Sequence, residues 1–326
     1  MTSIPRHELE KIPYLDAQNV NGRVLSSVCF YDKDEWHMWI PVEKTLLKIE
    51  GKPADGFYFS KDPVAQSDVY LEFLDFMAQR ACWPEVVPLW FGIRDDIFNM
   101  TASLRKFQVL HEASSTYKLE STRFCVTELE YLFSLCRSVF DLLQELVSKQ
   151  WNTVKLLAQD QKKKSIPASF SKIVLHDNKL RSVQEISEKY LLPMELAQYY
   201  GRHSEFFQIL RTFRDRFIHG GSSIDSIYLT ERGFAVPKDT EPFCQFEVWN
   251  QDHRTANGLC SLRPAIAHIV VKTLEACDDY AHTIQKIIQY PPPLVPGFRF
   301  YMTGPTTSEL HHLLLVIQEC QWWENA

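Results

Sequence analysis

Hydrophobic residues follow a strand-like pattern near the start of the chain and a helical period beyond it. Residues 1–62 contain two short apolar pieces, "RVLSSVCFY" and "GFYFS", which prolines separate from their surroundings. From residue 63 to about 290, apolar positions recur at steps of three and four, the spacing of one helix face. The pattern predicts a mainly α protein, in which a helical bundle over residues 63–290 follows an irregular, partly β extension.

Six helices are expected in the bundle, with ranges 67–83, 84–112, 120–157, 183–192, 193–219 and 262–290. Two alternating segments, "SIYLTERGFAV" and "FCQFEVWN", predict a small β-hairpin at about 224–250. Residues 291–326 form a separate C-terminal segment. There, "PPPLVPG" predicts a stiff spacer and "TSELHHLLLVIQECQWW" an amphipathic helix, which Trp322 and Trp323 are expected to anchor.

Composition and charge narrow the class of protein. The chain has 326 residues, of which 45% are hydrophobic, enough for a substantial core. The formal net charge of -6 means that the surface as a whole is not a nucleic-acid footprint, so a polyanion would need a local basic patch. The lysine run 162–164 predicts a solvated loop, with an RNA contact as the alternative.

Several functional classes lack their sequence signatures. The eight cysteines show no CxxC spacing, which favours buried reduced thiols over a zinc or redox site. The start of the chain has no apolar signal core, and no apolar run approaches 18 residues, so we expect a cytoplasmic protein with no membrane span. The chain holds no Walker A, GxGxxG, HExxH or GxSxG pattern.

The helix expected over residues 193–219 ends in "RTFRDRFIHGG", which carries the strongest candidate chemistry. An apolar stripe on its core face comprises Phe206, Leu210, Phe213 and Phe217. Arg211, Asp215 and His219 step by four along a different face, so the carboxylate could orient the imidazole. Gly220 and Gly221 supply the left-handed C-cap, and we expect positive φ at one of them.

Arg214 and His219 stand five residues apart, which is about 140° around a regular helix. One regular helix cannot direct both side chains at one small target. They converge only if the last turn unwinds at the glycines, or if two chains pair and each contributes to a shared cleft. The spacing therefore favours a composite site in a homodimer.

The segment "RDRFIHGG" resembles the Rx4–6H motif of the HEPN superfamily, all-helical domains in which a polar residue usually follows the arginine. Asp215 takes that place here. Two other Arg–His pairs have a similar spacing, Arg263–His268 and Arg105–His111, but neither has the polar second residue and the glycine stop. The resemblance covers about residues 67–290 and implies a HEPN-like helical bundle.

The resemblance implies a metal-independent endoribonuclease that uses no cofactor and leaves a 2′,3′-cyclic phosphate, in defence, toxin or RNA-processing roles. It assigns Arg214 to the phosphate, His219 to proton transfer and Asp215 to orienting the histidine. Arg211 and Arg216 are expected to support RNA binding. The alternative is a HEPN module without catalysis, used for dimerisation, RNA binding or contact with a protein partner such as an antitoxin.

Other polar pairs predict weaker sites. The aspartate pairs Asp95–Asp96 and Asp278–Asp279 are more typical of solvated helix faces than of metal sites. His311 and His312 are adjacent, so they diverge by about 100° on a helix and do not readily hold one ion. No metal site is therefore expected from these pairs.

Overall fold

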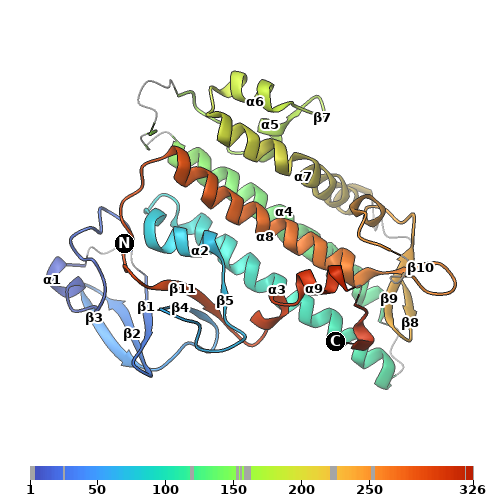
Figure 1. Ribbon diagram of the computed structural model, residues 1–326, viewed down its shortest axis with the longest axis horizontal. Coiled ribbons are helices and arrows are strands. Elements are labelled where there is room, and N and C mark those ends of the chain that lie inside the picture. The colour runs from blue at the N-terminus through green and yellow to red at the C-terminus, as the bar shows by residue number, and fades with distance from the viewer. Residues whose placement is uncertain are drawn as a thin grey trace.

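Four long helices lie side by side in the computed structural model and form the body of the molecule (Figure 1). They are α3 (Val87–Tyr117), α4 (Thr122–Trp151), α7 (Met194–Gly220) and α8 (Leu262–Ile287). The structure describes residues 4–24, 26–117, 121–151, 154, 156–157, 163–220, 226–250, 254–319 and 321–325. Helix α4 contacts each of the other three, and about half of its residues are buried. The helices match the sequence prediction closely because their apolar stripes repeat over many turns.

A six-stranded mixed sheet packs at one end of the helical body (Figure 1). Its strand order is β3 (Thr45–Glu50), β2 (Glu35–Val42), β1 (Val28–Asp32), β4 (Gly56–Ser60), β11 (Arg299–Thr303) and β5 (Val69–Tyr70). Strands β1 and β4 are parallel, and the other neighbouring pairs are antiparallel. The two ends of the chain thus meet in one sheet.

The predicted fold class is wrong: the chain has a mixed α/β fold rather than a mainly α bundle with an irregular extension. The largest error concerns β11, which follows the proline-rich spacer at a place where no strand was expected. It pairs Phe300 with Phe59 and Tyr301 with Tyr70. Such partners stand more than two hundred residues apart, and a local hydrophobic pattern contains no information about them.

Two further segments differ from the prediction. The helix expected over 67–83 is shorter, because residues 69–70 form strand β5; it consists of α2 (Glu72–Phe76) and a π-helical turn, η1 (Met77–Ala81). The segment "FCQFEVWN" holds a 3₁₀ turn, η2 (Phe243–Phe246), and not a strand. The hairpin instead joins β8 (Tyr228–Thr230) to β9 (Gly233–Pro237), which β10 (Leu259–Ser261) extends.

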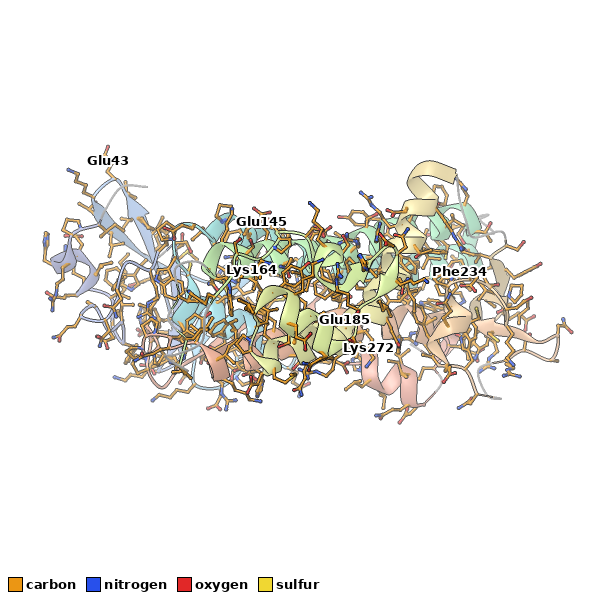
Figure 2. All side chains as sticks on the ribbon, turned by 90° about the horizontal axis from the view of Figure 1, so that it is seen from above. Glu43, Glu145, Lys164, Glu185, Phe234 and Lys272 are labelled. Carbon is orange, nitrogen blue, oxygen red and sulfur yellow. The ribbon has the colours of Figure 1, made fainter. Side chains whose placement is uncertain are left out.

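The shorter elements complete the molecule. The N-terminal helix is α1 (Arg6–Leu9). Between α4 and α7 lie α5 (Phe170–Val174), β6 (Leu175–His176), β7 (Lys179–Leu180) and α6 (Val183–Tyr190). The C-terminal segment forms η3 (Thr307–Leu310), α9 (Leu313–Gln318) and η4 (Trp323–Asn325), not the single helix that was expected. Figure 2 shows an elongated molecule, with Glu43 of the β2–β3 turn near one end and Phe234 of β9 toward the other.

Buried polar contacts join the N- and C-terminal segments to the helical body. Arg23 is buried and donates to the backbone carbonyls of Gln79 and Pro292. The Gln79 amide donates to Phe298 O at 2.9 Å and accepts from Val295 N at 2.9 Å. Trp322 and Trp323 are buried, at 0% and 4% exposure, as the tail-anchor prediction requires.

No described helix is both long enough and apolar enough to cross a bilayer.

Candidate functional site

The C-terminal part of α7 presents the predicted arginine cluster at the surface of the helical body. Leu210 and Phe213 are buried in the core, and the Phe213 ring packs against Phe133 with a centroid distance of 4.6 Å. This anchoring of one helix face leaves the polar positions of the same turns directed away from the core. The side chain of Phe217, the fourth predicted stripe residue, lies outside the described residues.

Asp215 pairs with two arginines. Its Oδ2 atom lies 3.6 Å from Arg211 Nε, and its Oδ1 atom lies 3.3 Å from Arg214 Nη1. The three side chains are 33–42% exposed, with Arg211 the least and Arg214 the most exposed. Ion pairs at such exposure contribute little to stability, so the cluster does little for the fold. One carboxylate shared between two guanidinium groups also leaves both arginines able to accept a further anion.

Arg216 lies on a neighbouring part of the same surface. It is exposed, and together with Arg211 and Asp215 it lines an open groove of about 550 Å³ beside Leu175 and Asn178. Arg214 does not line this groove. The structure therefore brings Arg211, Asp215 and Arg216 to one groove. Arg214 lies outside it but contacts Asp215.

The side chain of His219 lies outside the described residues, so its expected contact with Asp215 remains a prediction. The backbone of α7 is helical through Gly220, which removes unwinding before His219 as a way to bring Arg214 and His219 together. Their divergence of about 140° on a regular helix therefore stands. Gly221, the second residue of the predicted C-cap, also lies outside the described residues.

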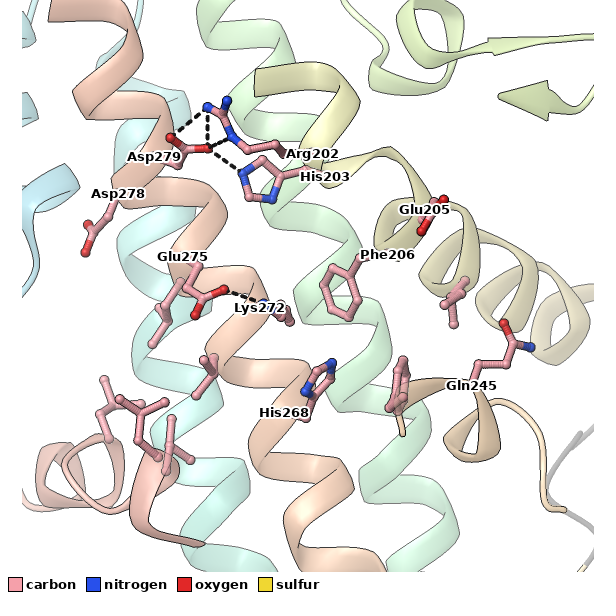
Figure 3. Close-up of a pocket in the computed structure, with 17 residues that line it drawn as sticks. Arg202, His203, Glu205, Phe206, Gln245, His268, Lys272, Glu275, Asp278 and Asp279 are labelled. Atoms are coloured by element: carbon pink, nitrogen blue, oxygen red, sulfur yellow. Dashed lines mark hydrogen bonds and ion pairs between the residues drawn. The ribbon is translucent and has the colours of Figure 1, made fainter. Parts of the chain in front are cut away.

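A second hollow, which the sequence interpretation missed, lies between α7 and α8 (Figure 3). This α7–α8 groove has a volume of about 880 Å³, and η3 and α9 close one side of it. At one end, Arg202 Nε donates to Asp279 at 2.9 Å, and His203 Nε2 lies 2.9 Å from the same carboxylate. Figure 3 shows these three side chains converging at the rim, while His268 and Phe206 face the hollow.

The charged groups of the α7–α8 groove are largely paired with one another. Burial alone would raise the pKa of Asp279, but hydrogen bonds from His203 and Arg202 lower it, which keeps the carboxylate charged. Lys272 Nζ lies 2.8 Å from Glu275, and the further acids Glu205 and Asp278 also line the groove. The groove therefore offers no surplus positive charge to a phosphate.

His268 is half-buried in the groove wall. Burial and the nearby Lys272 lower its pKa to about 4, so the ring is neutral at physiological pH. The rest of the wall is mainly apolar, with Phe206, Ile209 and Val271 among its residues. This lining is suited to an apolar group rather than to a nucleic-acid backbone.

The aspartate pair at 278–279 does not form a solvated face, contrary to expectation. Asp279 holds Arg202 and His203, and Asp278 Oδ1 accepts from Phe73 N at 2.8 Å. Two adjacent aspartates inside an apolar helix were the only sequence sign of these contacts. The residues that they contact lie far away in the chain. The described part of the lysine run is exposed and irregular, as predicted; Lys163 donates to Trp151 O at 2.7 Å, and Lys164 donates to Lys189 O at 3.2 Å.

The cysteines and the possible metal ligands were the remaining candidates from the sequence. The seven described cysteines are free and, except for Cys244, buried, which confirms the expectation of reduced thiols for them. Within the described ranges, no three His, Cys, Asp or Glu side chains are grouped so that they could hold a metal ion. Comparison of the chain with family models, curated proteins and solved structures yielded no match.

Proposed function

We propose that the C-terminal end of α7 is the active site of a HEPN-type endoribonuclease that acts as a homodimer. The supporting observation is the exposed cluster in which Asp215 is shared between Arg211 and Arg214. With Arg216, three arginines face one aspartate, so this turn carries a local positive charge on a chain of net charge -6. The α7–α8 groove, whose charges are internally paired, is a poorer place for a phosphate.

The proposed chemistry needs one phosphate-binding arginine and one proton-transfer group. The ribose 2′-oxygen forms a bond to the adjacent phosphorus, and the bond from phosphorus to the 5′-oxygen breaks. His219 takes the proton from the 2′-hydroxyl and delivers it to the departing 5′-oxygen, because an imidazole titrates near neutral pH. Arg214 binds the phosphate oxygens through its planar guanidinium, which stabilises the growing charge. Asp215 holds the arginines in place.

The helical backbone up to Gly220 supports a two-chain site. Arg214 of one copy and His219 of the other would meet across the two-fold axis, because the two side chains diverge within one helix. The alternative function is a HEPN-like module that binds RNA or a protein without cleaving. The same exposed arginines would serve it, so catalysis must be measured directly.

The first test is cleavage of mixed RNA in EDTA, with detection of 2′,3′-cyclic phosphate ends. We expect His219→Ala and Arg214→Ala each to reduce the rate by about 10²- to 10⁴-fold. Arg214→Lys should restore activity only partly, since an ammonium group cannot bind two phosphate oxygens in a fork. Two matched controls should leave the rate unchanged: Arg105→Ala, half-exposed on α3, and His176→Ala, exposed on β6.

The second test mixes the inactive Arg214→Ala and His219→Ala proteins. In a two-chain site, half of the re-formed dimers are mixed and each has one intact site, so about one quarter of the wild-type activity should return. A site within one chain would recover nothing. Full activity in a folded His219→Ala protein would exclude the proposed role of His219. RNA binding without cleavage by the wild type would favour the non-catalytic module.

A further inference from the structure

A cavity of about 340 Å³ lies between the six-stranded sheet and the start of α3, far along the chain from the arginine cluster of α7. Its walls are mainly apolar and aromatic, with Phe57 and Phe59 from β4 and Phe300 from β11. Trp90 and Arg94 enter it from α3. The volume is at the lower end of the range for small-molecule sites, roughly 300–1,000 Å³. We call it the sheet–α3 cavity.

Arg94 is the charged group of this cavity. Three aromatic rings surround its guanidinium carbon, at centroid distances of 4.4 Å for Phe57, 4.5 Å for Phe91 and 5.1 Å for Trp90. Such rings hold a cation in place but accept none of its hydrogen bonds along the guanidinium plane. Among the described residues, Arg94 has no ion pair within 4.0 Å, and its Nε atom is buried without a hydrogen-bond partner.

Trp90 contributes a second donor without a partner. Its side chain is 3% exposed, and its Nε1 atom is buried with no acceptor in the part of the chain that the structure covers. Buried donors are almost always paired with protein or water, so each exception requires a cause. Here two of them, one turn apart on α3, belong to residues that line the same cavity. Arg94 and Trp90 thus bring two donors without partners to the wall of one cavity.

The lining also determines the charge that fits. Of the described residues that line the cavity, Arg94 alone carries a formal charge. Cys29 and Cys82 also line it, but burial raises the pKa of each thiol to about 12, so both are neutral and supply no anion. An anionic group is therefore favoured beside Arg94. One guanidinium and one indole N–H match the two oxygens of a carboxylate better than the three oxygens of a phosphate.

We infer that the sheet–α3 cavity binds a small monocarboxylate with an apolar or aromatic body, whose carboxylate pairs with Arg94 and accepts from Trp90. The apolar body would lie against Phe57, Phe59 and Phe300. The exposed residues Ser26 and Ser27 form part of the lining and are expected to mark its entrance. This site is independent of the proposed ribonuclease and serves a ligand, not an RNA.

Binding is measured on the full-length protein with octanoate and 3-phenylpropionate, by calorimetry and by the rise in melting temperature. The neutral probes octanol and 3-phenylpropanol have the same apolar bodies without the charge, and inorganic phosphate has the charge without the body. We expect the carboxylates to bind at least about tenfold more tightly than the alcohols, since a charge-assisted pair is worth at least that factor. Phosphate alone should not bind measurably.

Arg94→Met keeps the apolar packing among the rings and removes the charge. It should abolish the preference for carboxylate over alcohol, whereas Arg105→Met, on the exposed side of the same helix, should leave it unchanged. If Arg94→Met does not fold, Arg94→Lys replaces it, and the preference should fall without disappearing. The inference is overturned if no carboxylate binds, if the alcohols bind equally well, or if the Arg94 variants bind like the wild type.

Discussion

Two adjacent aspartates of α8 are expected to respond in opposite ways to the same substitution. Asp278 is half-buried beside the acidic Glu72, and its carboxylate accepts from the backbone N–H groups of Phe73, at 2.8 Å, and of Glu72. Burial raises the pKa of Asp278 to about 6. For Asp279, hydrogen bonds from His203 and Arg202 outweigh burial and lower the pKa of the carboxyl. Replacing each by Asn therefore removes an unfavourable charge in one case and a favourable charge in the other.

The size of the Asp278 effect follows from its pKa. The difference between about 6 in the folded protein and the ordinary 3.8 corresponds to an upper limit of about 3 kcal/mol. Because the folded pKa is raised, that stability is present below the unfolded pKa and is lost as the pH rises through 6. Asp278→Asn retains an acceptor for Phe73, so it should raise the free energy of unfolding by about 1–3 kcal/mol at pH 8. About half of the gain should vanish at pH 5.

Asp279→Asn should instead destabilise the protein at pH 8. The substitution leaves His203 and Arg202 without their charged acceptor, and hydrogen bonds to charged groups are worth about 1.5–3 kcal/mol. Arg202 is 49% exposed, so solvent compensates in part and we expect a loss of about 1–2 kcal/mol. Because the folded pKa of Asp279 is lowered, this loss shrinks as the pH falls toward that pKa.

The assay is urea unfolding at pH 5 and pH 8, followed by tryptophan fluorescence and circular dichroism. Comparing variants at each pH cancels the opposing contribution of His268, whose lowered pKa removes stability as the pH falls below its ordinary 6.5. The control is Asp62→Asn, an exposed aspartate in the β4–β5 connection, which should change the free energy by less than about 0.5 kcal/mol. A less stable Asp278→Asn protein at pH 8 would refute the reasoning.

Three further predictions concern the packing of the chain ends and the assembly. Gly233→Ala should lower the free energy of unfolding by about 2–3 kcal/mol, because φ is +135° and the new Cβ would lie 2.5 Å from Trp323. The control Gly22→Ala, with φ +76° and open space around the new Cβ, should lower it by only about 1 kcal/mol. Equal melting temperatures of the two variants would contradict this prediction. Gln79→Ala should lower the free energy of unfolding in urea by about 2–4 kcal/mol, because it leaves the backbone N–H of Val295 and the carbonyl of Phe298 without their partner. Replacing the exposed Gln184 by Ala should change it little. Light scattering at micromolar concentration should give the mass of a dimer, whose interface we expect to bury at least about 1,000 Å². A monomer would rule out the two-chain site.

Local sequence signals were enough to locate the long helices. The expected range 193–219 compares with Met194–Gly220, and 262–290 compares with Leu262–Ile287. Each apolar stripe repeats over six or more turns, so its period is unambiguous without knowledge of the partner. The pairing of Arg211 with Asp215 also followed from the sequence, because a step of four on a helix always brings two side chains together.

Only the tertiary structure decided the sheet, the α7–α8 groove, the sheet–α3 cavity and the contacts of the charged groups around them. Strand β11 is short, and its partners in β4 and β5 lie more than two hundred residues earlier. Arg202 and Asp279 likewise meet only because α7 packs against α8, and Arg94 meets Phe57 only because the sheet covers α3. A hydrophobic period records which face of an element is buried but not what buries it. Long-range pairs of this kind are therefore decided by how the whole chain packs, and no short stretch of sequence determines them.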